Sequence, residues 1–209
     1  SHLGIPFGSA AATGIPVYMP WLGKKAYDGI MAAYTAASRK NGKKYIPLIK
    51  NATQLYVIEK GALCGVVLDG SYNLTEANYK TSLQNMVDRV LITDKDGNQI
   101  GVVEDTAAQQ KYGVVQTVYK QEDGKDAQTE AKALLQTLEQ TGSVTGCPGD
   151  SRAVSGYALI VQETTTGLFG KFYIESDTHT FTDGKHEMAL TLAFSNMMDE
   201  KEIENQSQG

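Results

Sequence analysis

The fold is decided by Gly167-Leu-Phe-Gly-Lys-Phe-Tyr-Ile-Glu-Ser-Asp-Thr-His-Thr-Phe-Thr-Asp-Gly-Lys-His-Glu-Met-Ala-Leu-Thr-Leu-Ala-Phe194, in which apolar and polar residues alternate. Successive side chains of a strand point to opposite faces, and the Val, Ile, Thr, Tyr and Phe residues of both arms favour strands. Between the arms lies Asp183-Gly184, which is a strong turn signal. The stretch therefore predicts an antiparallel β-hairpin.

The length of the turn decides which residues of this hairpin face each other. A two-residue turn would place the carboxylates of Asp177 and Glu175 opposite leucines on the apolar face. A three-residue turn at Thr182-Asp183-Gly184, with Gly184 in the left-handed conformation, pairs apolar residues instead. We therefore predict the three-residue turn. It pairs Ile174 with Leu192 and Phe172 with Phe194.

In this register the second face of the hairpin is polar, and we expect it to meet water or a polar partner. His179 would lie directly across from Glu187, and His186 would lie on the other face. The polar face would hold Glu175, Asp177, His179, Glu187 and Thr191.

Composition is that of a soluble globular protein, with 209 residues of which 41% are hydrophobic and 21% charged. A net charge of −5 argues against a nucleic-acid-binding surface, because phosphate neutralisation needs clustered Lys and Arg. No apolar run approaches the roughly 18 residues of a membrane span, and no export signal is expected. The two cysteines, Cys64 and Cys147, are too few for a disulfide scaffold, so free thiols and cytoplasmic synthesis are expected.

The N-terminal third predicts a small helix-plus-hairpin domain over residues 20–65, preceded by a linker or extended arm over residues 1–19. Apolar residues recur at helical spacing from Lys24 and the helix should stop at Asn41-Gly42. Two strand-like segments follow at residues 44–50 and 54–60, and Pro47 indicates an edge strand.

The remainder predicts an α+β fold. We expect a mostly antiparallel, tube-like β-barrel or strongly curved sheet of six strands over residues 66–199, with one helix packed on it. The helix would begin at the N-cap Asp126 and end at Thr141-Gly142. A charged tail over residues 200–209 should be disordered. The six strands are expected at residues 87–93, 99–103, 114–120, 154–163, 171–181 and 186–194.

No residue is assigned a metal-binding or cofactor-binding role. Of the three histidines, His2 lies at the terminus, and His179 and His186 would lie on opposite faces of the hairpin. A zinc site needs three or four ligands, so it is not predicted. Gly167-Leu-Phe-Gly-Lys171 is too short for a phosphate-binding loop and precedes a strand.

Catalytic residues are not assigned either. Glu175, Asp177 and Glu187 are carboxylates of the kind that glycosidases use in pairs, but i, i+2 carboxylates are common on solvated strand faces. A triad of Ser176 or Ser155 with His179 and Asp177 lacks the Gly-x-Ser-x-Gly elbow.

An ordered series of segments resembles the baseplate hub proteins of contractile phage tails. It is most similar to the XkdQ/YqbQ-like hubs of defective prophages and phage-tail-like bacteriocins, in the late control protein D group. The resemblance covers about residues 3–199 and lacks the family's N-terminal portion. The segments are Trp21-Leu-Gly-Lys-Lys-Ala-Tyr-Asp-Gly-Ile-Met-Ala-Ala-Tyr34, Gly42-Lys-Lys-Tyr45, Leu55-Tyr-Val-Ile-Glu-Lys-Gly61, Asn85-Met-Val-Asp-Arg-Val90 and the Gly167–Phe194 hairpin.

The resemblance implies a structural, non-enzymatic protein of a phage virion or tail-like particle, made in the bacterial cytoplasm. It implies a trimer in the assembled particle, with two tube-like domains per subunit, joining the tail tube to the spike. Its partners would be copies of itself and the tail tube, spike, tape-measure and baseplate proteins, without specific nucleic-acid binding or membrane contact. Residues 66–199 would be the second tube-like domain.

The competing function is a tail-associated peptidoglycan hydrolase or a cell-wall sugar-binding module. Its candidate patch is Glu175, Asp177 and Tyr173. If the hub interpretation holds, Glu175, Asp177 and Glu187 could line a channel without adhering to its contents, provided that they are not buried within one subunit.

Overall fold

A computed structural model describes residues 6–18, 25–50 and 52–202 of the chain. The chain divides into two compact units, one made of Ser1–Tyr79 with Gly142–Gly209 and one made of Lys80–Thr141. The domain division expected from the sequence, with boundaries after residues 19, 65 and 199, stays a prediction. Trp21, His2 and residues 203–209 lie outside the described residues.

The first unit contains the helix and hairpin that the sequence predicts. Helix α1 (Ala26–Asn41) ends where Gly42 takes a left-handed φ of 73° and its N–H bonds to the carbonyl of Ser38. Strands β2 (Tyr45–Lys50) and β3 (Gln54–Glu59) pair antiparallel, and β1 (Phe7–Ala10) joins the other edge of β3 in parallel. The order β1-β3-β2 confirms that Pro47 lies in an edge strand.

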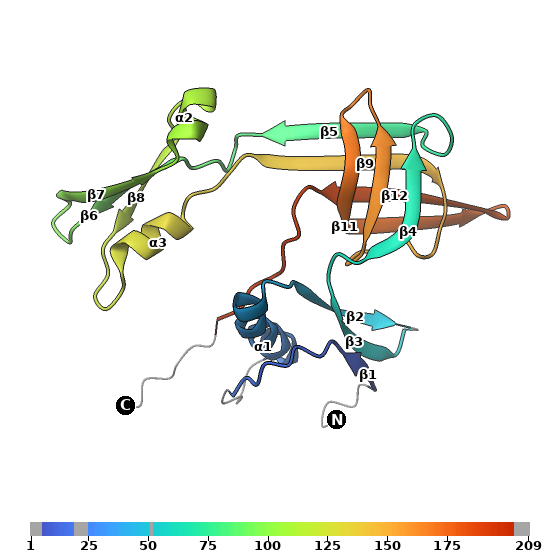
Figure 1. Ribbon diagram of the computed structural model, residues 1–209, viewed down its shortest axis with the longest axis horizontal. Coiled ribbons are helices and arrows are strands. Elements are labelled where there is room, and N and C mark those ends of the chain that lie inside the picture. The colour runs from blue at the N-terminus through green and yellow to red at the C-terminus, as the bar shows by residue number, and fades with distance from the viewer. Residues whose placement is uncertain (1–5, 19–24, 51, 203–209) are drawn as a thin grey trace. The chain divides into compact units, whose positions relative to one another are not determined.

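The same unit contains most of a six-stranded sheet with the order β4-β10-β11-β12-β9-β5 (Figure 1). Its strands enclose a core of buried apolar side chains, among them Leu68, Leu159, Leu168, Ile174 and Leu192. Burial of each such side chain stabilises the fold by about 1.5–3 kcal/mol. The strands are β4 (Leu63–Asp69), β5 (Glu76–Ser82), β9 (Glu139–Pro148), β10 (Ala158–Glu163), β11 (Leu168–Thr182) and β12 (Lys185–Ala193).

The second unit is a three-stranded sheet of order β7-β6-β8 with two short helices. The side chains of Val90 and Ile92 are buried against Ala131 of α3. Asp105 and Asp126 cap α2 and α3 by accepting hydrogen bonds from the N–H groups of Ala108 and Thr129, and the cap at Asp126 was predicted. The elements are β6 (Arg89–Thr93), β7 (Gln99–Glu104), α2 (Thr106–Tyr112), β8 (Gln116–Lys120) and α3 (Ala127–Ala133).

The chain is mixed α/β and consists mostly of strands. The prediction of a single six-stranded antiparallel barrel is wrong, because it groups strands that belong to two separate sheets. The segments predicted at residues 87–93, 99–103 and 114–120 form the separate sheet of the second unit, in which β6 and β8 run parallel. The predicted helix packs on that smaller sheet. The larger sheet is completed by β4, β5 and β9, and closure into a barrel is not confirmed.

Helix α3 ends at Ala133, eight residues before the predicted end at Thr141. Gln136 exchanges two backbone hydrogen bonds with Val87, at 3.0 and 2.9 Å, and this bridge draws the chain out of the helix. The residues from Glu139 to Pro148, expected to be helix and then loop, form strand β9. Tertiary pairing therefore overrides the helical propensity of the leucines that follow Ala133.

The β11–β12 hairpin is confirmed, but its turn has two residues rather than three. Asp183 and Gly184 both have positive φ, 50° and 75°, as a type I′ turn requires, and Thr182 pairs with Lys185. A β-bulge between Ile174 and Ser176 then shifts the register by one residue. Ile174 consequently faces Leu192 as predicted, whereas Asp177 faces Leu190 and His179 faces Met188.

Candidate functional site

The bulge in β11 divides the predicted polar face of the hairpin between its two faces. Glu175 and Glu187 are exposed, and Thr191 pairs with Ser176 on the face away from the core. Asp177 and His179 instead follow the core face, because they pair with the buried residues Leu190 and Met188. The placement of Asp177 and His179 with Glu175 was therefore wrong.

At the end of the core face, the loop of residues 149–155 closes over a small polar cluster. The N–H of Ser155 donates to the Asp177 carboxylate over 2.6 Å, and the N–H of Gly149 donates to the carbonyl of His186 over 2.7 Å. His179 Nδ1 lies 2.8 Å from His186 Nε2, and His179 Nε2 lies 3.1 Å from the carbonyl oxygen of Ala153. The predicted placement of His179 and His186 on opposite faces of the hairpin was thus also wrong, because it followed from the three-residue turn.

For two neutral rings, these contacts decide which nitrogen of each imidazole carries the proton. A carbonyl oxygen only accepts, so the Nε2 of His179 carries its proton and the Nδ1 accepts. His186 must therefore donate from Nε2 to His179 Nδ1. The ring of His186 also stacks on Phe181, with ring centroids 4.1 Å apart and an angle of 15° between the planes. Both imidazoles serve to hold the loop against the hairpin.

The same cluster contains the residues of the possible serine triad. His179 Nε2 lies 3.6 Å from the Asp177 carboxylate, but the hydroxyl of Ser155 donates to the carbonyl of Glu175 over 2.8 Å. Both ring nitrogens of His179 have other partners. No serine hydroxyl therefore contacts an imidazole nitrogen among the described residues, and the arrangement is that of a structural cap.

Of the three carboxylates considered for a glycosidase pair, Glu175 and Asp177 do not share a face. Glu175 is exposed on the outer face, whereas Asp177 lies on the core face and is bound by the backbone of Ser155. A glycosidic bond must lie between its two catalytic carboxylates. The geometry therefore gives Glu175 and Asp177 no joint role in such a reaction.

The loop of residues 149–155, here called the capping loop, has one carboxylate, Asp150. The Arg152 guanidinium binds it through Nε and Nη2, with distances of 2.9 and 2.6 Å to its two oxygens. Hydrogen bonds from this side chain and from the N–H of Arg152 lower the pKa of Asp150 to about 2. The pair stiffens the turn that leads into Ala153.

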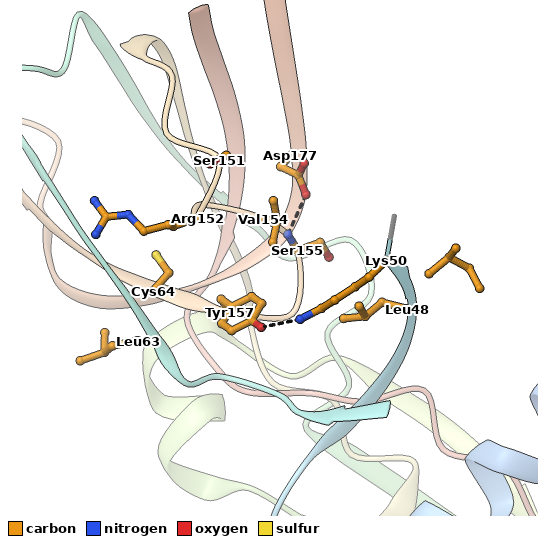
Figure 2. A pocket seen from close by; sticks show the side chains of 11 residues that line it. Leu48, Lys50, Leu63, Cys64, Ser151, Arg152, Val154, Ser155, Tyr157 and Asp177 are labelled. Atoms are coloured by element: carbon orange, nitrogen blue, oxygen red, sulfur yellow. Dashed lines mark hydrogen bonds between the residues drawn. The ribbon is translucent and has the colours of Figure 1, made fainter. Parts of the chain in front are cut away.

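A cavity of about 710 Å³ opens beside this loop (Figure 2). It lies between β2 and β4, and the side chains of Lys50, Tyr157 and Asp177 converge on it (Figure 2). Sequence reasoning missed this cavity because its residues come from four separated segments, and β4 was not predicted as a strand. The lining residues are Leu48, Ile49, Lys50, Leu63, Cys64, Ser151, Arg152, Val154, Ser155, Tyr157 and Asp177.

Within the part of the chain that the structure describes, no group of three or more His, Cys, Asp or Glu side chains is arranged to hold a metal ion. Over those same residues, no helix has the length and apolar character that a membrane span requires. The two cysteines are free, and Cys147 is buried while Cys64 borders the cavity. Burial raises the pKa of the Cys147 thiol to about 11.

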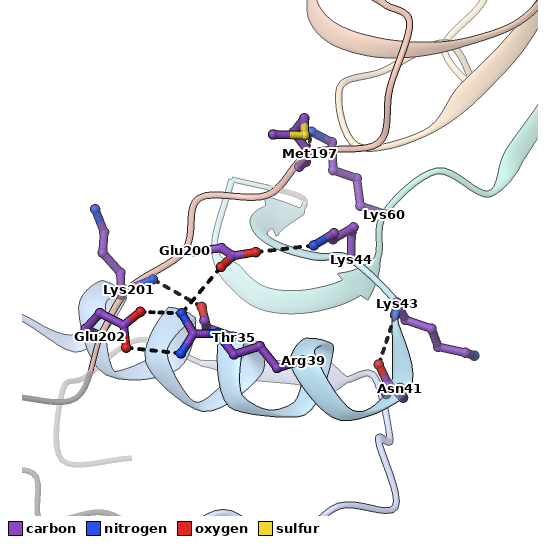
Figure 3. A network of polar contacts seen from close by, with 10 residues as sticks. All are labelled: Thr35, Arg39, Asn41, Lys43, Lys44, Lys60, Met197, Glu200, Lys201 and Glu202. Carbon is purple, nitrogen blue, oxygen red and sulfur yellow. Dashed lines mark hydrogen bonds and ion pairs between the residues drawn. The ribbon is translucent and has the colours of Figure 1, made fainter. Parts of the chain in front are cut away.

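The start of the predicted disordered tail contacts helix α1 (Figure 3). The N–H of Lys201 donates to the hydroxyl of the buried Thr35 over 3.1 Å. Arg39 binds the Glu202 carboxylate with two nitrogens, and Glu200 lies 3.2 Å from the ammonium group of Lys44. Residues 200–202 thus lie along the helix, held by one partly buried hydrogen bond and several exposed ion pairs.

Comparison with known proteins places the chain among phage proteins. The family model described as YQBQ-like matches residues 1–193. A curated relative, the phage-like element PBSX protein XkdQ of Bacillus subtilis (strain 168), is 26% identical over 195 residues. The alignment covers 83% of this chain and 56% of that protein, so the chain spans little more than half the length of this relative.

A solved structure shares the fold. The 43 kDa tail protein of prophage MuSo2 from Shewanella oneidensis superposes with a TM-score of 0.60 at 13% sequence identity. The match covers 91% of this chain and 60% of that protein. The likeness extends through both compact units, because it takes in nearly all of the chain.

Proposed function

The chain belongs to the YQBQ-like family, as a phage tail protein of the XkdQ/YqbQ type, and we propose that it is the central hub of a contractile tail baseplate. In this role it joins the tail tube to the spike, as a trimer in the assembled particle. The match to the family over residues 1–193 is the observation that carries the proposal. The tube, spike, tape-measure and neighbouring baseplate proteins are its proposed partners.

The hairpin supplies a surface suited to this role. Glu175 and Glu187 are exposed on the face away from the core. These two carboxylates are therefore not buried within one subunit, as a channel-lining role requires. Asp177 leaves that set because it lies on the core face. A polar, acidic wall repels acidic polymers and offers few apolar contacts to a passing chain.

Deleting the gene from the bacterium that encodes it tests the proposal. Without its hub a baseplate cannot nucleate tube assembly, so tails should be missing from the lysate under electron microscopy. Expression of the full-length gene in trans should restore them. Complete, functional tails in the deletion strain would refute a hub role.

The hydrolase alternative is tested on the purified protein. The hub proposal predicts that neither the wild-type chain nor its Glu175→Gln variant releases soluble fragments from purified peptidoglycan. Release by the wild type that the Glu175→Gln substitution abolishes would favour the enzyme instead.

A further inference from the structure

The cavity beside the capping loop is bounded by the outer edges of two sheets. Strand β2 is the last strand in the order β1-β3-β2, and β4 is the first strand of the six-stranded sheet. The cavity contains residues of both strands, including Lys50 of β2 and Leu63 of β4. Edge strands present N–H and C=O groups that can pair with another extended chain.

The outer edge of β4 already shows how such pairing would work. The side-chain amide of Asn73 donates to the carbonyl of Val67 over 3.0 Å and accepts from the N–H of Asp69 over 2.7 Å. It therefore occupies the place of a neighbouring strand at one end of the edge. Among the described residues, no strand lies beyond β4 to do the same at its other end.

That other end is Leu63, next to the cavity. Ala158 of β10 pairs with Leu63 in a parallel ladder, and its N–H donates to the carbonyl of Ala62 over 2.8 Å. In a parallel pair such a residue bonds the neighbours of its partner, so the N–H and C=O of Leu63 point to the outer edge. Leu63 is 55% exposed, and Val67 of the same strand is also an exposed apolar residue.

The cavity also contains the ammonium group of Lys50, which has no ion-pair partner among the described residues; Asp177, which lines the same cavity, accepts from the N–H of Ser155. The ammonium group of Lys50 lies 3.4 Å from the hydroxyl of Tyr157 and about 5–6 Å from the ring centroids of Tyr56 and Tyr157. Among the described residues, no carboxylate forms an ion pair with Lys50, whereas the nearby Arg152 is paired with Asp150. Lys50 thus lies near the rings of Tyr56 and Tyr157 and remains open to a ligand. Figure 2 shows its ammonium group beside the hydroxyl of Tyr157.

We propose that this cavity binds an extended acidic segment of a partner protein, which pairs with β4 at Leu63 and places a carboxylate on Lys50. Apolar side chains of the segment would cover Leu63 and Ile49, both of which are more than half exposed. The cavity volume of about 710 Å³ lies within the range of known ligand sites, about 300–1,000 Å³. The proposal goes beyond the hub assignment and does not depend on it.

A synthetic peptide, acetyl-Val-Thr-Val-Glu-Val-Thr-amide, serves as the probe, with the whole chain in solution and nuclear magnetic resonance as the readout. We expect saturable shifts of backbone signals in β4, β2 and the loop of residues 149–155. Lys50→Glu should lower the affinity about tenfold or more, and the peptide with Lys in place of Glu should bind this variant in return. Lys171→Glu is the matched control, because Lys171 is an exposed strand lysine 5.0 Å from the Tyr173 ring and outside the cavity.

Two further arms test the backbone pairing. A peptide N-methylated at every residue should not bind, because no N–H of the segment is left to pair with β4. Leu63→Pro should also abolish binding while keeping the β10 pairing, since it removes an outward N–H. Unchanged binding to Lys50→Glu, equal binding of the N-methylated peptide, or shifts outside the cavity would overturn the proposal. So would binding of acetyl-glutamate amide as tight as that of the hexapeptide, or no saturable binding below about 1 mM.

Discussion

The Nδ1 atom of His179 lies 2.8 Å from the Nε2 atom of His186, across the two arms of the β11–β12 hairpin. This contact exists because the two-residue turn places both rings on the core face, where the loop of residues 149–155 closes over them. The pair thus connects the tip of the hairpin to the loop that borders the cavity.

The histidine contact predicts one pattern of ring protons when both rings are neutral. His179 should carry its proton on Nε2, which donates to Ala153, and His186 should also be protonated on Nε2. Long-range ¹H–¹⁵N correlation spectra distinguish the two tautomers of each ring. A His179 ring protonated on Nδ1 would contradict the assignment, and His186→Ala should change the His179 signals while Lys185→Ala leaves them in place.

The turn predicts a position-specific cost of adding a side chain. Gly184→Ala should lower the free energy of unfolding by about 1 kcal/mol or more, because Gly184 has a φ of +75°. Asp183→Asn should be nearly neutral, since Asn suits the first position of a type I′ turn. Urea denaturation measures both changes. Equal stability of Gly184→Ala and wild type would contradict the two-residue turn.

The two thiols should differ in reactivity. Cys147 is fully buried and its pKa is raised to about 11 by desolvation, so little thiolate forms and reagents are excluded. Cys64 is only partly buried beside the cavity. Iodoacetamide should therefore modify Cys64 first in the folded chain, as peptide mass spectrometry can record. In urea, where the chain is unfolded, both cysteines should react at equal rates, which serves as the control. Equal rates at both positions in the folded chain would contradict the burial of Cys147.

The Asp150–Arg152 pair should contribute a stability that depends on pH. The folded-state pKa of Asp150, about 2, lies below the value of about 3.9 expected in the unfolded chain. The carboxylate therefore stabilises the fold above pH ~3.9, and this contribution is lost as the pH falls through about 2. Asp150→Asn should lower the unfolding free energy at about pH 6 and have little effect near pH 2. A difference that persists undiminished at the lower pH would contradict this prediction.

Local signals in the sequence predicted the local structure well. The end of α1 at Gly42, the Asp126 cap of α3 and the edge position of Pro47 each follow from the conformational or hydrogen-bonding limits of one residue type. Ile174 was also paired correctly with Leu192.

Features that depend on distant parts of the chain were not predictable in the same way. Strand β5 reads as a polar connection because most of its side chains are exposed, and β9 reads as helix and loop until it pairs within the sheet. The bulge at Ile174–Ser176 allows the hairpin to have both the two-residue Asp-Gly turn and the pairing of apolar residues. A prediction that assumes strict alternation of side chains along the strand cannot include such a bulge. The cavity at Lys50 needs the contact of separated segments and has no local signal.

The most direct test of the proposed function is cryo-electron microscopy of intact tail particles from the bacterium that encodes this chain. The hub assignment predicts three copies around the particle axis, between the end of the tail tube and the spike, with Glu175 and Glu187 on the face toward the channel. Density for this fold on the tail exterior, or particles that lack the chain altogether, would contradict it.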